Sequence, residues 1–181
     1  MNTLRCFFLV IPFLLLSCKN ETPIEDLKLT QYKILNSDVY LELEMIVEED
    51  DVFSIFYTED GSFNYSAEKM LKRKVKGNSQ PQIILFNFPE STKPTAIRID
   101  IGVNPNQKKI IFKRYKFNYF DNQLILKDSF FKYYRTNPFF TYNSKKKVLI
   151  PTKAKEKYDP ILFCKPALVK KLKQLINDKN G

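Results

Sequence analysis

The stretch VYLELEMIV at residues 39–47 alternates between apolar side chains and side chains that tolerate water. A period of two is typical of a β-strand with one face buried and the other solvated. The buried face would carry every second residue, namely Val39, Leu41, Leu43, Met45 and Val47. Glu42 and Glu44 would share the opposite face. The stretch therefore predicts a half-buried strand in a β-rich domain.

More strand signals follow this stretch at short intervals. An acidic turn at 48–51 precedes an apolar run at 52–58, and we expect residues 39–47 and 52–58 to pair as an antiparallel hairpin. Further strands are expected at 72–76, 82–88, 95–101, 108–118 and 123–127, with another candidate at 148–150. Within 108–118, the alternation slips by one residue between Phe112 and Tyr115, which indicates a β-bulge.

This pattern has turns between strands and no crossover helices, so the strands should be antiparallel. We predict a mainly β fold, an antiparallel, jelly-roll-like β-sandwich over residues 31–150 with a C-terminal α-helix. Residues 151–181 are expected to form a loop and then a helix at 166–177, with leucines on one face and lysines on the other. We expect this tail to pack on the domain, although the pattern also fits a small appendage.

The N-terminal end of the chain has the features of an export signal. Arg5 precedes an apolar run at residues 6–16, shorter than the ~20 residues that a membrane-spanning helix needs. The run ends in Leu15-Leu16-Ser17-Cys18, which resembles the bacterial lipobox. That resemblance implies a signal peptide at residues 1–17, cleavage between Ser17 and Cys18, and lipid on the Cys18 thiol. An ordinary secretory leader with a chance cysteine is the alternative.

The lipobox resemblance also implies where the protein resides. Several acyl chains on Cys18 would hold it firmly on a membrane, because each buried methylene contributes ~0.8 kcal/mol. Residues 18–30 would be the lipidated cysteine and a flexible tether. We therefore expect a lipid-anchored protein of the bacterial cell envelope, most simply on the outer membrane, with no cofactor besides this covalent lipid.

Composition argues against several kinds of catalysis. The chain has no histidine and only four glycines, which excludes histidine-based triads and gives no glycine-rich phosphate loop. Cys164 would be the one thiol left after removal of the leader and lipidation of Cys18, so no disulfide framework is expected, and its apolar neighbours predict a buried, inert side chain. We expect a protein that is not an enzyme; a glycan hydrolase built on paired carboxylates is the alternative.

Charge is unevenly distributed in a chain whose net charge is +10. Residues 19–104 have an excess of acidic side chains, and residues 105–181 have a large excess of lysine and arginine. This basic excess indicates either attraction to anionic headgroups or acidic polysaccharide, or a solvated lysine surface. We expect no nucleic acid partner, because the chain is predicted to leave the cytoplasm.

Two segments carry a second resemblance. VFSIFYTEDGSFN at 52–64 and IRIDIGVNPNQKKIIFKRYKF at 97–117 combine an Asp-Gly turn, an Arg-x-Asp strand and an Asn-Pro loop. They are similar to β-sandwich accessory domains of bacterial cell-surface polysaccharide proteins. The resemblance implies a fold like that of carbohydrate-binding modules, and binding of cell-surface or environmental glycan. A structural or assembly subunit that binds an envelope protein is the alternative function.

Two groups of residues are candidate sites. The first is aromatic and would be either a surface for glycan or a protein partner or a second core layer; its members are Tyr133, Tyr134, Phe139, Phe140 and Tyr142. The second is a set of loop oxygens from Asp100, Asn104 and Asn106, which would either bind calcium or form the turn.

Replacing Cys18 with Ser tests the lipid anchor. Without the thiol no lipid can be attached, so the C18S protein should move from the membrane pellet to the soluble fraction after cell lysis and ultracentrifugation. The unchanged protein in the same cells is the control. Sedimentation of C18S with the membranes would show that the lipoprotein hypothesis is wrong.

Overall fold

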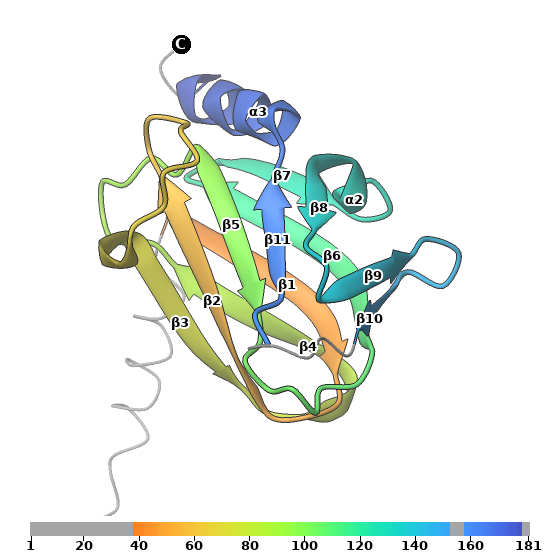
Figure 1. The fold of residues 1–181 in the computed structure, drawn as a ribbon. Coiled ribbons are helices and arrows are strands. Elements are labelled where there is room, and N and C mark those ends of the chain that lie inside the picture. The colour runs from red at the N-terminus through yellow and green to blue at the C-terminus, as the bar shows by residue number, and fades with distance from the viewer. Residues whose placement is uncertain (1–37, 153–157, 179–181) are drawn as a thin grey trace, which may run out of the picture.

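The computed structural model describes residues 38–152 and 158–178 (Figure 1). The predicted lipobox with Ser17 and Cys18, and the tether, lie outside these residues. The strands are β1 Val39–Val47, β2 Asp51–Thr58, β3 Met70–Val75, β4 Asn78–Asn87, β5 Ala96–Ile101, β6 Ile110–Tyr119, β7 Asn122–Leu126, β8 Tyr134–Thr136, β9 Phe140–Asn143, β10 Val148–Pro151 and β11 Ile161–Cys164. The helices are the 3₁₀ turn η1 Ala67–Lys69, the short α2 Phe130–Tyr133 and α3 Pro166–Asn177.

The strands form two antiparallel sheets packed face to face (Figure 1). Sheet A has the order β4-β1-β6-β10-β9, and β7 also pairs with β6. Sheet B has the order β3-β2-β5-β11-β8. The predicted antiparallel sandwich with a C-terminal helix is confirmed.

Strand β1 lies inside sheet A, between β4 and β6, and has the predicted alternation. Its five inward side chains are buried and the residues between them are half-exposed. The predicted bulge is also present, because Glu44 pairs with Arg114 whereas Met45 pairs with Phe112. Lys113 is the extra residue and is exposed, which restores the inward direction of Phe112.

The predicted hairpin of residues 39–47 with 52–58 is wrong. Strand β1 belongs to sheet A, whereas β2 pairs with β3 and β5 in sheet B. Residues 48–50 therefore cross from one sheet to the other, and residues 76–77 make a second crossing between β3 and β4. The two crossings touch: Gly77 N donates to Asp50 Oδ1 at 2.8 Å, and a Cβ on Gly77 would collide with the Glu48 carbonyl oxygen.

The C-terminal segment contributes more to the domain than a loop and a helix. Strand β11 lies between β5 and β8 in the interior of sheet B, so the sandwich extends beyond residue 150. Helix α3 then packs on the domain through four buried side chains, Leu168, Val169, Leu172 and Ile176. The appendage alternative is wrong. Within residues 38–152 and 158–178, no helix has the length and apolar character needed to cross a membrane.

A buried carboxylate joins the first crossing to the loop between β5 and β6. Asp51 is only 7% exposed, and its Oδ1 accepts from the backbone N–H groups of Val52, Val103 and Asn104 at 2.8, 2.7 and 3.1 Å. Its Oδ2 accepts from Gln107 Nε2 at 2.8 Å. Gly102 begins this loop with a φ of +114°, and a Cβ there would collide with the Asp51 carboxylate. These contacts fix the loop at residues 102–108.

We expect Gly102→Ala to lower the free energy of unfolding by about 3 kcal/mol, from backbone strain and displacement of Asp51 from its donors. Gly61→Ala is the matched control. Gly61 also has a positive φ, +84°, but its Cβ would meet mainly the flexible end of Lys173. Denaturant unfolding followed by far-UV circular dichroism should show a loss of only about 1 kcal/mol for this control. Equal losses would contradict the role assigned to Asp51.

Candidate functional site

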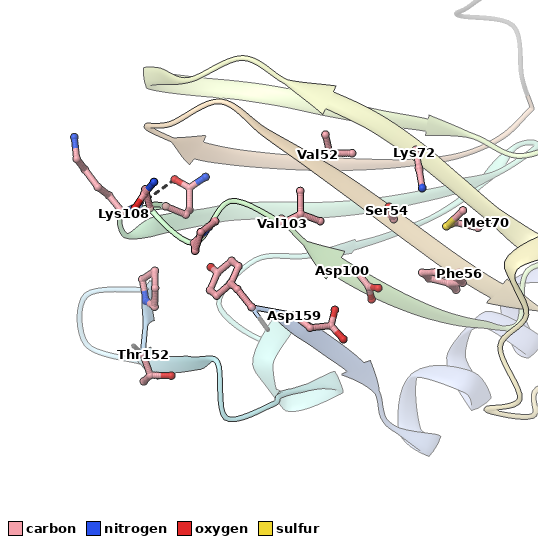
Figure 2. Close-up of a pocket in the computed structure, with 16 residues that line it drawn as sticks. Val52, Ser54, Phe56, Met70, Lys72, Asp100, Val103, Lys108, Thr152 and Asp159 are labelled. Carbon is pink, nitrogen blue, oxygen red and sulfur yellow. Dashed lines mark hydrogen bonds between the residues drawn. The ribbon is translucent and has the colours of Figure 1, made fainter. Parts of the chain in front are cut away.

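A large open groove of about 1260 Å³ lies on the outer face of sheet B (Figure 2). Its floor is formed by Val52, Ser54 and Phe56 of β2, Met70 and Lys72 of β3, and Asp100 of β5. One wall is the loop at residues 102–108; the opposite wall contains Pro151, Thr152, Tyr158 and Asp159. The residues between Thr152 and Tyr158 lie outside the described part of the chain.

Side chains of β2 point alternately into the core and into the groove. Phe53 and Ile55 are fully buried between the sheets, so Ser54 and Phe56 project from the other face. Figure 2 shows Ser54 and Phe56 on strand β2, with Asp159 on the segment that leads into β11. The groove is therefore built on a rigid sheet with loop walls.

An ion pair marks the edge of the groove. Arg98 Nε and Nη2 donate to the two oxygens of Asp100 at 2.7 and 2.6 Å, and the guanidinium carbon lies 4.5 Å from the centre of the Phe56 ring. Burial raises the pKa of Asp100 above its usual value; Arg98 lowers this pKa and the Asp159 charge raises it. Because Arg98 engages both oxygens, this carboxylate is held in a charge-assisted pair.

Tyr158 is the second aromatic side chain of the groove. Its ring makes edge contacts with Phe139 and Phe140, at centroid distances of 6.0 and 6.3 Å. Its hydroxyl is buried without a hydrogen-bond partner among the described residues, and burial raises its pKa to about 12. An unpaired buried hydroxyl is unfavourable, so an added polar group that reached it would be stabilised.

The aromatic segment predicted as a surface is divided by the structure. Tyr134 and Phe140 are 1% and 3% exposed, so the exposed-surface hypothesis is wrong for these two residues. Both belong to the core cluster, and Tyr134 stacks on Phe130 at 4.6 Å between ring centres. Tyr133, Phe139 and Tyr142 are half-buried. This segment contacts the groove wall through Phe139 and Phe140, whose rings meet Tyr158, and through Asn137 Nδ2, which donates to the Asp159 carbonyl oxygen at 2.6 Å.

The candidate calcium ligands have other partners. Both Asp100 oxygens accept from Arg98, and Asn104 Oδ1 accepts from Asn106 N at 2.9 Å. Asn104 Nδ2 donates to the Asp50 carbonyl oxygen at 3.0 Å. The structure thus supports the turn interpretation. Among residues 38–152 and 158–178, no cluster of three or more His, Cys, Asp or Glu side chains is placed to hold a metal ion.

Cys164, Glu42 and Glu44 lie where their sequence pattern predicts. Cys164 is buried as expected, and burial raises its pKa to about 11, which leaves the thiol uncharged at neutral pH. Glu42 and Glu44 project from sheet A, the sheet opposite the groove. They form ion pairs there: Arg114 lies 3.6 Å from Glu42 and 2.9 Å from Glu44.

Sequence reasoning missed most of the groove. The sequence predicts Asp100 and Asn106 only as candidate calcium ligands, and it gives no functional signal for Ser54, Phe56, Tyr158 or Asp159. The spacing of Arg98 and Asp100 is the one signal that could have indicated part of it, because residues i and i+2 share a strand face and opposite charges there can pair. No signal in the sequence predicts that residues 151–152 and 158–159 lie near β2.

Comparisons with known proteins do not identify the chain: no family model, no curated protein and no solved structure matches it. The site must therefore be interpreted from its own geometry.

Arg98→Leu should show how far Asp100 depends on its partner. Without Arg98, the pKa of the buried carboxyl rises further, so the folded state binds its proton more readily than the unfolded state. Stability is then retained below the unfolded pKa and lost as pH rises through the raised folded pKa. We expect a loss of about 2 kcal/mol at pH 7 and a smaller loss at pH 4, measured by urea unfolding.

The double variant R98L/D100N is the control for this experiment. It has no carboxyl group at position 100, so its difference from the unchanged protein should vary much less between pH 4 and pH 7. A loss in R98L that is the same at both pH values would show that Arg98 does not govern the ionisation of Asp100.

Proposed function

We propose that this protein is a lipid-anchored envelope protein whose β-sandwich binds glycan without catalysis, in the groove on sheet B. The lining of the groove is the observation on which this proposal rests. It combines two aromatic side chains, Phe56 and Tyr158, with hydrogen-bonding groups from Ser54, Thr152 and Asp159. Sugar rings present apolar faces and hydroxyl edges, and this lining complements both.

The lipid anchor is supported by the sequence of the leader, and glycan binding by the resemblance of residues 52–64 and 97–117 to accessory domains of polysaccharide proteins. Both segments enter the groove region: the first contains Ser54 and Phe56, and the second contains Asp100 and the wall at 102–108. The residues whose sequence resembles glycan-binding domains therefore include residues that line this groove.

A second function, hydrolysis of the bound glycan, is favoured by one specific observation. Asp100 and Asp159 both line the groove, and the pKa of Asp100 is raised mainly by burial, as a general acid requires. Against this, Arg98 occupies both Asp100 oxygens, which keeps the carboxylate from presenting a proton to a ligand. We therefore place binding before hydrolysis.

Phe56→Ala tests the groove. A glycan array with residues 19–181, which contain every strand of both sheets, selects the glycan, and calorimetry measures its affinity. Loss of the ring should weaken binding about fivefold to tenfold, which corresponds to about 1 kcal/mol of stacking. Tyr133→Ala is the matched control, because Tyr133 is also a half-buried ring beside a cation, with Lys171 Nζ 5.8 Å from its centre. It should change affinity less than twofold.

Other outcomes would change the proposal. Weaker binding in Y133A and not in F56A would indicate that glycan binds at the aromatic segment of residues 133–142 and not in the groove. No binding to any glycan would contradict the proposal and favour the assembly subunit with a protein partner. Release of shorter sugars from the bound glycan, abolished by Asp100→Asn, would establish the hydrolase.

A further inference from the structure

A second, smaller hollow of about 390 Å³ lies on the same face of sheet B. Its lining includes the basic residues Arg98, Arg135 and Lys165, although Lys165 Nζ donates to the Phe131 carbonyl oxygen at 3.2 Å. Phe63, Tyr65 and Phe163 contribute rings. None of the residues that line it is acidic. It adjoins the groove, because Arg98 lines the hollow and stacks on Phe56, which lines the groove. Sugar units bound along the groove could therefore extend into it.

The two arginines are placed to act together. Arg98 on β5 and Arg135 on β8 are separated by β11, so their Cα atoms are about 10 Å apart at the usual strand spacing. Phe163 of β11 lies opposite Arg135, whose guanidinium carbon is 4.7 Å from the ring centre. Both guanidinium groups are thus supported by aromatic rings, which holds their planar forks above the sheet.

Neither guanidinium group is fully used by the protein. The hydrogen bonds of Arg98 to Asp100 use Nε and Nη2, which leaves Nη1. Arg135 is exposed, and no carboxylate in residues 38–152 or 158–178 pairs with it. The hollow therefore offers N–H donors in the fork arrangement that binds a carboxylate through two parallel bonds.

Two further features favour a negative ligand group. The Tyr65 hydroxyl is buried without a hydrogen-bond partner in the described chain, so it lacks an acceptor. Helix α3 begins at the hollow: Lys165 is its N-cap residue and provides no side-chain cap, and Pro166 is at its first turn. The N-terminus of a helix of this length adds partial positive charge.

We propose that this hollow is a subsite for the carboxylate of a uronic acid residue, so that the glycan in the groove is an acidic one. Arg135 binds the carboxylate with its fork, and Arg98 contributes Nη1 from the boundary with the groove. The rings of Phe63 and Phe163 contact the apolar face of the sugar. This inference rests on the proposed glycan binding and specifies its substrate class.

Arginine Nε–H signals in two-dimensional ¹⁵N NMR test the subsite directly. Residues 19–181 contain four arginines, and Arg73 and Arg114, which bond Leu85 O and Glu44, serve as internal controls. Glucuronate and galacturonate are titrated beside their methyl esters, which keep the ring but lose the charge. The acids should shift the Arg98 and Arg135 signals and the esters should not.

Arg135→Gln should weaken uronate binding about tenfold, whereas Lys146→Gln, which removes the same charge from the exposed turn between β9 and β10, should change it less than twofold. Equal responses to acid and ester, shifts confined to Arg73 and Arg114, or no shift with either uronate would overturn the subsite. If neutral glycans still bind and F56A still weakens them, the subsite fails and the proposed function stands.

Discussion

One buried carboxylate holds the end of the sandwich together. Asp51 accepts four hydrogen bonds, three of them from backbone N–H groups, at the point where the chain has just crossed from sheet A to sheet B. A buried carboxylate is tolerated only when its oxygens are satisfied, and here Val103, Asn104 and Gln107 donate from a loop about fifty residues away in the sequence. The position of the loop at 102–108 is therefore set by the need to supply hydrogen-bond donors to the Asp51 carboxylate. Because that loop is one wall of the groove, the same requirement that stabilises the fold also shapes the site.

Sheet B, which forms the floor of the groove, has one face in the core and the other face toward the groove. On β2 and β5, every second side chain fills the core, and the residues between them, including Ser54, Phe56 and Asp100, lie on the outer face. Arg98 and Asp100 follow from this arrangement, since residues two apart on a strand are neighbours on one face. Their pair neutralises Asp100 at the floor of the groove and leaves part of the Arg98 guanidinium available at its edge. This ion pair thus lies between a groove that contains carboxylates and a hollow whose charged lining residues are all basic.

Local pattern predicted most strands and could not predict their partners. Residues 39–47, the slip near Lys113 and the helix at 166–177 depend on side-chain periodicity, which is a property of the segment itself, and all three are as expected. The hairpin failed because a turn of three acidic residues looks the same whether the chain returns to its own sheet or crosses to the other. Strand β11 was missed because four residues are too few to show a period. The sequence does not predict the groove, because the groove joins residues 52–56 and 100–108 with residues 151–152 and 158–159, and no local signal reports that proximity.

The distribution of charge over the surface also depends on which strands pair. The acidic first part of the sequence and the basic second part do not form two separate surfaces in the described chain, because strand pairing interleaves them. Acidic residues at 48–50 pair with Lys76, Lys108 and Lys109, and Glu42 and Glu44 pair with Arg114. Exposed pairs of this kind add little stability, but each pair offsets charge locally. Arg135 differs from these residues, since its guanidinium lies on a ring in a hollow with no carboxylate in the lining. No carboxylate of the described residues pairs with Arg135, which fits the proposed anionic ligand better than a role in solubility alone, because a position on the open surface would serve solubility equally well.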